Sequence, residues 1–582
     1  MHYQPAVEDT GFILFEVLKG AQILGELPEF SDCDAGLMQQ ILGEAGKFVA
    51  FEIAPLQRVG DEEGCVFTAG EVRTPPGFRA AYQSFWQSGW ASLSCAPEDG
   101  GQGLPEVLNQ VLYEMLSAAN HGWTMAPGLL HGAYECLKHH GNAELKTTYL
   151  PKMASGEWLA TMCLTEPHAG SDLGLVRTRG APQPDGSYHV SGTKIFISGG
   201  EHDLSTNIIH LVLARLPDAP LGPKGLSLFL VPRVLPGDLR NAVHCERIEE
   251  KMGLHGSATC VMRFDEATGW LVGEVNRGLN AMFVMMNAAR LHVGLQGVGL
   301  LDAAWQKADA YSSERRQMRA PGSRTSSEPS DLIARHPAMR RILDTQRAWI
   351  DGGRVLAYRT ALALDLARHH PDAARRAQAE RWCSLVTPVL KAALTQQAFY
   401  GASECLQVFG GHGYVREWGI EQIVRDARVA MIYEGTNEIQ AIDLLVRKVL
   451  GDGGKAMGLL LSELDGTLGA NSDADDPAGI KALQLIDDLR DVTAALVQAA
   501  GNNAELPFWV ADDYLRLVAL ALQAWAWSQI GSTLRRGAAG GNTERWSAPA
   551  QALQLWVLPE FGTRLAIIRA RLAAVASPGV AA

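Results

Sequence analysis

The sequence lacks several patterns that would assign it to a class at once. No stretch of its 582 residues approaches about 18 uninterrupted apolar residues, so we expect no membrane span. Its nine cysteines are scattered and form no Cys-x-x-Cys pair. This spacing argues against a disulfide framework or a zinc site and favours reduced thiols in the cytoplasm. The first twenty residues show no basic leader, so we expect no secretory signal.

Two further absences narrow the function. No Gly-x-Gly-x-x-Gly motif follows a predicted strand, so a Rossmann-type nicotinamide site is not expected. Basic residues are too few to balance the acids, and the formal net charge is -13. A surface that binds nucleic acid needs the opposite balance. The remaining composition, with 47% apolar and 20% charged residues, is that of an ordinary globular protein.

The hydrophobic pattern changes three times along the chain. Residues 1–157 are expected to be helical, with one apolar face formed by Leu108, Val111, Leu112, Met115 and Leu116. Residues 158–275 contain short β-branched and aromatic runs such as YHVSGTKIFIS and GLSLFLVPRV, which predict a β domain. Helical periodicity returns over residues 276–450, and a last helical segment with its linker covers residues 451–582. The expected fold class is therefore mainly α with a central β domain.

One stretch, VRDARVAMIYEGTNEIQAIDLLVRKVL at residues 424–450, poses a question about function. Its second half has apolar residues at helical spacing, and Asn437 with Gln440 resembles a capping box for that helix. Glu434 stands between an apolar run and Gly435. Such a carboxylate is either a solvated loop residue at a helix entrance or an acid held at the edge of a buried site.

Three motifs together indicate a family. They are MCLTEPHAGSD at 162–172, KMGLHGSATC at 251–260 and QVFGGHGYVREWGIEQIVRDARVAMIYEGTNEIQ at 407–440. In this order they resemble the flavin-dependent acyl-CoA dehydrogenases over about residues 50–450. The longer N-terminus and the tail look like a subgroup that includes 3-methylmercaptopropionyl-CoA and fatty acyl-CoA dehydrogenases. The resemblance implies a helical N-terminal domain, a β-barrel middle domain, a helical bundle and an extra helical tail.

The resemblance also implies a reaction and a catalytic residue. In this family a glutamate in the YEGT segment removes the proton α to the thioester, and that position is Glu434. Its backbone N–H, with a ribityl hydroxyl of FAD, would hold the thioester oxygen, while the flavin N5 takes the β-hydride. Some relatives place the base on the preceding long helix, but Ala289 occupies that position here. The product would be a trans-2-enoyl-CoA, and the electrons would pass to an electron-transferring flavoprotein.

Further residues fall on positions that bind FAD or substrate in the family. The implied FAD contacts are Met162, Leu164, Thr165, Gly170, Ser171, Phe196, Ser198, Gln407, Gly410, Gly411, Thr436 and Glu438, with Arg315 and Gln317 reaching the flavin of a neighbouring subunit. The implied substrate contacts are Ser171, Arg290, Tyr433 and Gly435. This division requires an obligate oligomer, a homodimer or homotetramer. Phe196 could instead be β-domain core, Arg315 a solvated side chain and Arg290 half of an internal ion pair.

Two alternative functions share the fold. An acyl-CoA oxidase would carry out the same first half-reaction and then use oxygen. A DNA-associated flavoprotein of a related tailed branch would bind DNA through its C-terminal part. Residues 451–582, however, carry 10 Lys and Arg against 14 Asp and Glu, which disfavours phosphate binding. Their apolar stripes, near Trp525 and Trp527, indicate packing or subunit contact. The acyl chain that the enzyme uses is not apparent from the sequence.

Overall fold

The computed structural model describes residues 2–322, 328–471, 477–537 and 543–576. By packing, the chain divides into two compact units. One unit holds residues 47–292, and the other holds residues 3–46 together with the chain from Val293 onward. The boundary between them falls inside one long helix, α9 (Gly278–Glu314). The four segments expected from the sequence therefore remain a prediction about domain boundaries.

Most helices of the first unit precede its sheet along the chain, and the first part of α9 follows it. The preceding helices are α4 (Gln57–Glu63), α5 (Phe78–Gln87), α6 (Glu106–Thr124), α7 (Leu130–His140) and α8 (Ala143–Ser155), while α3 (Ala35–Phe48) ends at the unit's start. A hairpin of β1 (Val66–Thr68) and β2 (Glu71–Arg73) interrupts this segment, which we expected to be helical throughout. Ala69 and Gly70 join the two strands, and both have positive φ. A two-residue turn with both φ angles positive matches the twist of a hairpin, which the short Ala-Gly signal did not reveal.

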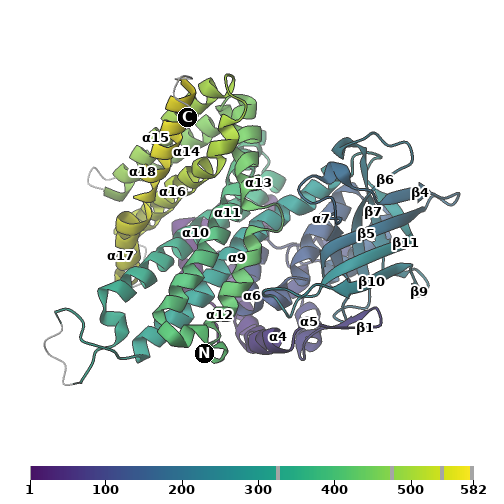
Figure 1. Ribbon diagram of the computed structural model, residues 1–582, viewed down its shortest axis with the longest axis horizontal. Coiled ribbons are helices and arrows are strands. Elements are labelled where there is room, and N and C mark those ends of the chain that lie inside the picture. Colours follow the sequence, from purple (N-terminus) through teal and green to yellow (C-terminus); the bar gives the residue numbers. More distant parts are fainter. Residues whose placement is uncertain (1, 323–327, 472–476, 538–542, 577–582) are drawn as a thin grey trace. The chain divides into compact units, whose positions relative to one another are not determined.

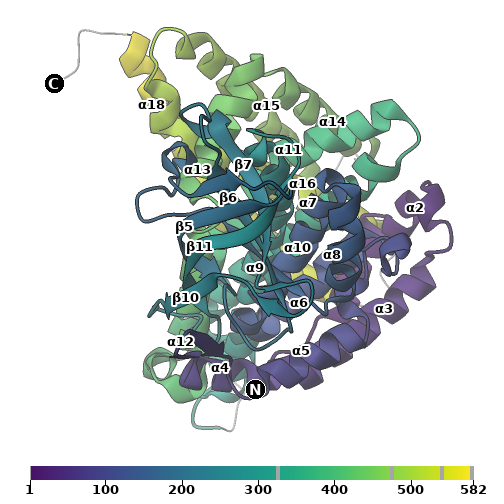
Figure 2. The same cartoon turned by 90° about the vertical axis from the view of Figure 1, so that its right-hand side faces the viewer.

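The sheet of this unit closes on itself (Figures 1 and 2). Its strands are β3 (Leu159–Cys163), β4 (Arg179–Pro182), β5 (Tyr188–Ser198), β6 (Ile208–Arg215), β7 (Leu226–Pro232), β10 (Val243–Ile248) and β11 (Thr259–Val272), beside a small ribbon of β8 (Val234–Leu235) and β9 (Leu239–Arg240). The pairing path runs β11–β5–β4–β6–β7 and returns to β11. Such closure forms a barrel, and Val190, Val212, Phe229, Cys260 and Phe264 fill its core.

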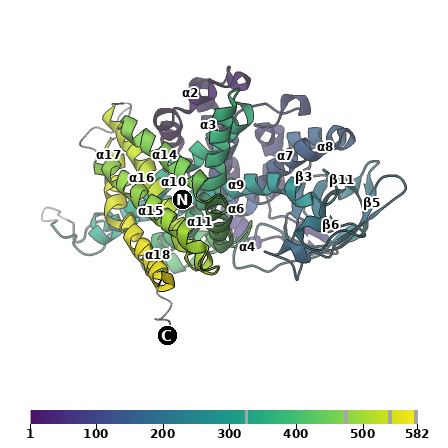
Figure 3. The same ribbon diagram turned by 90° about the horizontal axis from the view of Figure 1, so that it is seen from above.

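Among the residues that the structure describes, the regular elements of the second unit are all helices. Its elements are α1 (Val7–Gly11), α2 (Gly20–Leu24), α10 (Pro337–His369), α11 (Ala373–Val408), α12 (Ile420–Arg428), α13 (Asn437–Ile442), α14 (Lys455–Asn471), α15 (Pro477–Ala500), α16 (Leu506–Arg535), α17 (Thr543–Ala552) and α18 (Glu560–Ala576). Helix α16 packs against α10, α11, α13, α15 and α18 (Figure 3). The expected class, mainly α with a central β domain, is confirmed. None of the described helices is both long enough and apolar enough to cross a membrane.

The tail residues pack into this helical unit. Leu485, Leu489, Val492 and Leu496 are all buried, as the stripe on α15 predicts. The indole of Trp527 is buried and donates to the Ala348 carbonyl on α10 at 2.9 Å. Trp525 packs 5.8 Å from Trp382 of α11, measured between ring centroids. The tryptophans that we expected to mediate packing or subunit contact therefore lie against the helices of their own chain.

A charged cluster joins distant parts of the same unit. Three carboxylates, from Asp9, Asp302 and Asp351, meet three guanidinium groups, from Arg347, Arg354 and Arg545. Arg545 of α17 donates to Asp351 at 2.7 Å and to Asp9 at 2.9 Å. Both Asp302 and Asp351 are fully buried. Because buried charges are tolerated only when paired, each member stabilises its neighbours.

Replacing Arg545 by alanine should lower the free energy of unfolding by about 3–5 kcal/mol, because it removes one partner of a buried carboxylate. Burial raises the pKa of Asp351, but Arg347 and Arg545 lower it more, so the pKa lies below its ordinary value of 3.8. The cluster's stabilisation is therefore present above pH 3.8 and is lost as the pH falls further. Denaturant unfolding at pH 7 measures the loss. The matched control is Arg58→Ala, which removes an exposed pair with Glu62 worth at most about 1 kcal/mol. Equal losses in the two variants would contradict this role.

Candidate functional site

The backbone around Glu434 has an unusual conformation. Glu434 lies in the left-handed region with a φ of 54°, and Gly435 follows with a φ of 87°. A left-handed glutamate costs about 1–2 kcal/mol, because its Cβ approaches the following carbonyl oxygen. Such strain persists only where the surrounding structure enforces it, and it is concentrated at functional sites. Glu434 is half-buried, so it is neither a fully solvated loop residue nor a fully enclosed acid.

The capping box expected at Asn437 is wrong by one residue. Thr436 is the N-cap of α13, because its hydroxyl accepts a hydrogen bond from the Ile439 amide at 3.3 Å. Asn437 instead turns to α11, where its amide donates to the Ala392 carbonyl at 3.1 Å. The cap thus lies two residues after Glu434 and fixes where the irregular backbone ends and the helix begins.

A layer of buried polar groups holds this turn from behind. The ammonium of Lys391 in α11 is fully buried and donates to the Gly435 carbonyl at 2.7 Å and to Asn437 Oδ1 at 3.0 Å. The Gln440 amide donates to the carbonyls of Glu434 at 3.2 Å and Gly435 at 3.4 Å. Tyr433 donates its hydroxyl to Gln296 of α9 at 2.5 Å. Burial and then the charge of Glu434 raise the pKa of Tyr433, so the phenol keeps its proton.

In the barrel unit, Phe196 is the most informative of the predicted residues. Residues Ile195 and Phe196 of β5 lie opposite the single residue Val261 of β11, which makes a β-bulge. Phe196 has a φ of 59° and its side chain is 61% exposed. A bulge re-aims a side chain, which explains why an aromatic ring leaves the core in the middle of a strand. The alternative that Phe196 belongs to the barrel core is therefore wrong.

A turn beside Phe196 carries the TEPH segment. The Thr165 carbonyl accepts from the Ile195 amide at 2.9 Å, so Thr165 lies next to the bulge. Glu166 is buried and accepts from the Thr178 hydroxyl at 2.6 Å and the Lys194 ammonium at 2.9 Å. Lys194 is fully buried and also donates to the Leu164 carbonyl at 2.9 Å. Strand β5 therefore holds Leu164, Thr165 and Glu166, where the turn begins.

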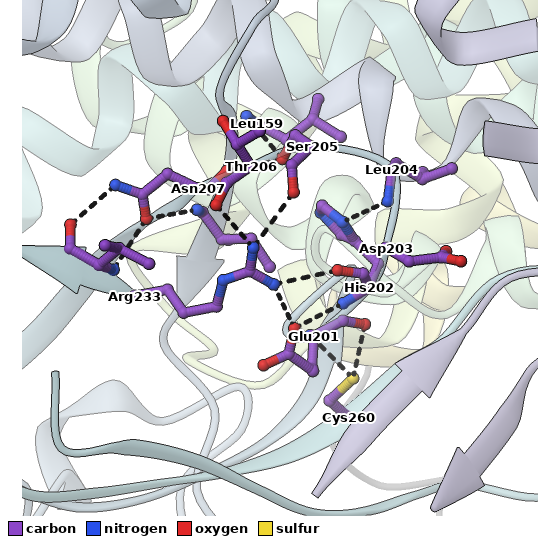
Figure 4. Close-up of polar contacts among 12 residues, drawn as sticks. Leu159, Glu201, His202, Asp203, Leu204, Ser205, Thr206, Asn207, Arg233 and Cys260 are labelled. Atoms are coloured by element: carbon purple, nitrogen blue, oxygen red, sulfur yellow. Dashed lines mark hydrogen bonds and ion pairs between the residues drawn. The ribbon is translucent and has the colours of Figure 1, made fainter. Parts of the chain in front are cut away.

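The loop that follows β5 is fixed by an arginine. Figure 4 shows the Arg233 guanidinium, which follows β7, paired with the buried carboxylate of Glu201. The same group donates to the carbonyls of His202 at 3.0 Å, Ser205 at 3.1 Å and Thr206 at 2.9 Å. Because carbonyls of a buried loop need donors, Arg233 stabilises the segment between β5 and β6. Hydrogen bonds therefore hold the backbone at Ile195, before Phe196, and at residues 202–206, after it.

The predicted phosphate and adenine contacts gather at two helix ends in the helical unit. Tyr311 of α9 stacks on Phe409, just after α11, with ring centroids 4.3 Å apart. This contact brings the segment of Arg315 near that of Gly410. The carbonyl of Arg315 accepts from the Ile333 amide at 2.8 Å, and the Gln317 amide donates to Asp331 at 3.0 Å. The backbone is anchored while both side chains are exposed. The polar composition of residues 312–331 is typical of a surface loop, but residues 312–314 belong to α9 and residues 323–327 lie outside the described residues.

The other predicted residues differ in exposure. Met162 and Arg290 are buried, and Leu164, Thr165, Ser198, Tyr433, Gly435 and Thr436 are half-buried. Gly170, Ser171, Gln407, Gly410, Gly411 and Glu438 are exposed. The structure brings Leu164, Thr165, Phe196 and Ser198 together in one unit, and it brings Tyr433 to Thr436 together in the other. His168, to which we gave no role, lies 3.1 Å from the Leu175 carbonyl and 3.3 Å from Glu166.

Sequence reasoning missed the residues that support these turns. Lys391, Lys194 and Gln440 contact the backbone of predicted site residues. The two lysines lie outside the three motifs, and Gln440, the last residue of the third motif, was assigned only to a helix cap. A signal was present for the two lysines. Each is the one charged residue in an apolar run, LVTPVLKAALT for Lys391 and GTKIFIS for Lys194. A lone lysine among core residues must find carbonyl or carboxylate partners. Its position therefore indicates nearby backbone carbonyls that no helix or strand satisfies.

Comparison with known proteins decides the family. The N-terminal, middle and C-terminal domains of acyl-CoA dehydrogenase match residues 38–157, 161–267 and 276–449. A 3-methylmercaptopropionyl-CoA dehydrogenase of Ruegeria pomeroyi is 45% identical over 461 residues, which are 78% of this chain and 78% of that protein. The chain belongs to the acyl-CoA dehydrogenase family. It is therefore an oxidoreductase that acts on CH–CH groups, and its cofactor is FAD.

Two further acyl-CoA dehydrogenases resemble this one. The broad-specificity linear acyl-CoA dehydrogenase FadE5 of Mycobacterium tuberculosis is 37% identical over 78% of this chain and 77% of its own. A solved acyl-CoA dehydrogenase of Bacillus anthracis, complexed with FAD, has a TM-score of 0.74 and 20% identity. That match covers 96% of this chain and 94% of the other. At this identity the structural match shows that the fold is shared.

The residues of this acyl-CoA dehydrogenase fit FAD. Phe196 offers an exposed ring, and Thr165 on the adjoining turn and Ser198 on the same strand offer hydroxyls, which suits a flat ring with polar edges. At Gly410 and Gly411 a Cβ would meet no atom within 4 Å, so the backbone is open to a phosphate. Gly410 also has a φ of 58°, which favours glycine. Arg315 and Gln317 supply an exposed cation and an exposed amide on the segment that lies near Gly410.

The Lys194→Met variant of this acyl-CoA dehydrogenase should lose bound FAD and stability, because it leaves the Glu166 carboxylate buried without its cation. Breaking a buried pair in this way costs about 3–5 kcal/mol. Flavin absorbance after gel filtration and the thermal unfolding midpoint measure the two effects. Adding Glu166→Gln to Lys194→Met should restore part of the FAD binding and part of the stability, because the double variant has no unpaired carboxylate. The control Lys152→Met removes an exposed pair with Glu157 and should change neither. If Lys194→Met behaves like this control, the pair does not support the flavin turn.

Proposed function

We propose that the enzyme oxidises an acyl-CoA thioester to the trans-2-enoyl-CoA, with Glu434 as the base that removes the α-proton. The observation that carries this proposal is the left-handed, half-buried Glu434 on a turn held by Lys391 and Gln440. A general base must lie within hydrogen-bond reach of the proton that it removes, and the half-buried Glu434 remains accessible to a bound thioester. Ala289 occupies the other position that carries the base in some relatives, so Glu434 has no competing carboxylate there.

The same turn would orient the thioester. Gly435 has no side chain, so an acyl-CoA can approach the backbone closely. A fixed backbone N–H at Glu434 would stabilise the negative charge that develops on the thioester oxygen, an effect of about 3–4 kcal/mol for one preorganised donor. FAD, when bound, accepts the two electrons that leave the substrate. Tyr433 keeps its proton and its hydrogen bond to Gln296, which positions the segment without taking part in proton transfer.

We further propose that FAD is shared between subunits. Thr165, Phe196 and Ser198 would hold the flavin ring, with Met162, Leu164, Gly170 and Ser171 near it. Arg315 and Gln317 would reach the pyrophosphate and adenine of a partner's FAD, and Gln407, Gly410 and Gly411 would complete that contact with Thr436 and Glu438. The exposure of Arg315 and Gln317 supports this assignment. The enzyme would then be a homodimer or homotetramer.

The substrate and the electron acceptor are the finer parts of the proposal. The relatives named above act on 3-methylmercaptopropionyl-CoA and on linear acyl-CoA, so we propose a substrate of one of these kinds. We propose an electron-transferring flavoprotein in the cytoplasm as the acceptor, and free thiols at all nine cysteines support a reducing compartment. An oxidase would differ in one test, since its reduced flavin would react rapidly with oxygen. DNA binding is disfavoured by the acidic tail and by its buried tryptophans.

The Glu434→Gln variant should keep its fold, its FAD and its acyl-CoA binding, yet fail to reduce the flavin. The amide is nearly isosteric with the carboxylate but cannot accept the α-proton at neutral pH. A general base contributes about 10²–10⁴-fold, and we expect a loss at the upper end or beyond. Anaerobic bleaching of the flavin by an acyl-CoA that the wild type uses measures this step. Asp491→Asn makes the same chemical change at an exposed residue of α15, and this variant should reduce its flavin at the wild-type rate. Reduction by Glu434→Gln within tenfold of the wild-type rate would show that Glu434 is not the base.

The Arg315→Ala variant should bind FAD about 10- to 150-fold more weakly without unfolding. A charge-assisted contact to phosphate contributes about 1.5–3 kcal/mol, which corresponds to that range. Flavin retention during dialysis, followed by titration of the apoprotein with FAD, gives the affinity. The neighbouring Arg316→Ala is the matched control, because Arg316 donates to the Ser330 carbonyl within its own chain. An unchanged FAD affinity in Arg315→Ala would remove Arg315 from the cofactor site.

A further inference from the structure

Helix α6 borders a small cavity inside the unit of residues 47–292. The cavity has a volume of about 20 Å³, and its lining mixes apolar residues with polar side chains from three helices, among them Gln110 and Tyr113 of α6, His131 of α7 and His292 of α9. Ala289 of α9 also lines it. The apolar residues suit an acyl chain, so the polar side chains among them are the unexpected part of a lining that includes the position of the catalytic base in some relatives.

Gln110 presents an unsatisfied acceptor. Its amide nitrogen donates to Glu106 Oε1 at 2.7 Å. Glu106 also pairs with His131 at 2.9 Å, and this carboxylate raises the pKa of His131 despite its burial. A carboxylate accepts hydrogen bonds and cannot donate, so the Gln110 nitrogen must face Glu106. The Gln110 oxygen then turns elsewhere, and it is buried with no hydrogen-bond partner among the described residues.

His292 presents a second unsatisfied atom. Its side chain is 7% exposed, and Nε2 has no hydrogen-bond partner in the described part of the chain. Burial lowers the pKa of His292 to about 4, so the ring is neutral at pH 7. The ring packs edge-on against Tyr113 at 5.0 Å between centroids, which fixes its orientation. A Cβ at Gly128 would lie 2.8 Å from Nε2, so glycine there leaves the room that the imidazole needs.

These two atoms define the chemistry of an occupant. Gln110 Oε1 requires a donor, and the neutral His292 Nε2 either donates or accepts. A hydroxyl group both donates and accepts, whereas a methyl group or a thioether sulfur offers no donor. The volume is enough for about one water-sized group, which a hydroxyl fills and a longer polar group exceeds.

We propose that this cavity receives a hydroxyl group carried by the acyl chain of the substrate, with Gln110 and His292 as the residues that recognise it. The inference rests on the proposed function, because it takes the space beside Ala289 to receive the acyl chain. It narrows the substrate class from plain acyl-CoA to hydroxyacyl-CoA. With an alkyl chain bound instead, a buried acceptor on Gln110 stays unsatisfied or a water molecule must fill the space.

The test compares matched substrates on the FAD-loaded wild-type enzyme. Each ω-hydroxyacyl-CoA from four to eight carbons is paired with the alkyl-CoA one carbon longer, so that a hydroxyl replaces a methyl group. The ratio of kcat/KM should favour the hydroxyl member by about tenfold or more at one chain length, since an unsatisfied buried polar group costs about 1–3 kcal/mol. 3-Methylmercaptopropionyl-CoA serves as the thioether probe and should behave like the alkyl series.

Variants of Gln110 and His292 test whether these two residues recognise the hydroxyl group. In Gln110→Met and in His292→Phe the preference should fall to within about twofold, because each removes one of the two partners. Ser117→Ala is the control: Ser117 is buried on α6 without a hydrogen-bond partner among the described residues and does not line the cavity, so the preference should remain. The wild-type comparison decides the matter even if one variant fails to fold.

The outcomes separate this inference from the proposed function. If alkyl members equal or exceed their hydroxyl partners at every length while still bleaching the flavin, the cavity holds only a water molecule, and the inference fails while the function stands. A preference that survives in both Gln110→Met and His292→Phe would also overturn it. If no acyl-CoA of either series bleaches the flavin, the proposed function fails and this inference fails with it.

Discussion

The ammonium of Lys391 lies in the core of the helical unit, and the turn that carries Glu434 depends on it. A helix or strand satisfies its own carbonyls, but a turn with two left-handed residues in succession does not. Lys391 satisfies the Gly435 carbonyl and also holds Asn437, so one buried charge connects α11 to both ends of the turn. Lys194 holds the Leu164 carbonyl and Glu166 in the same manner. In each unit, therefore, a buried lysine on a helix or strand stabilises an irregular turn of the predicted site. Burying the ammonium ion carries a cost in free energy.

This dependence explains what the sequence could and could not predict. The order of helices and strands follows from local periodicity, and Glu434 follows from a family motif. The exposure of Phe196 does not follow from either, because it arises from the register between β5 and β11, whose paired residues are more than sixty positions apart. Asn437 has the right residue type for a cap, but a partner on α11 competes for its amide and Thr436 takes the cap instead. Local rules fail at these positions because a non-local partner decides them.

Helix α6 shows a related limit of periodicity. The apolar face read from Leu108, Val111 and Leu112 is buried, yet Glu106, Asn109 and Gln110 on its polar side are buried as well. A helix surrounded on all sides cannot leave its polar residues in water, so they pair with one another and with His131. Sequence alone gives the polar positions but not their enclosure. The atoms that remain without partners after this pairing are the ones that can distinguish between substrates.

The charged cluster around Asp351 bears on how the chain is made. Asp9 and Arg545 are 536 residues apart, so a ribosome completes Asp9 about half a minute to two minutes before Arg545. Until Arg545 is made, the cluster can hold two of its three guanidinium groups, those of Arg347 and Arg354, against the three carboxylates. The helical unit therefore carries an excess negative charge in its core until α17 arrives. A chain released before Arg545 is made lacks one of the three guanidinium groups that pair with these carboxylates. Such a chain leaves part of the buried negative charge of the helical unit unpaired.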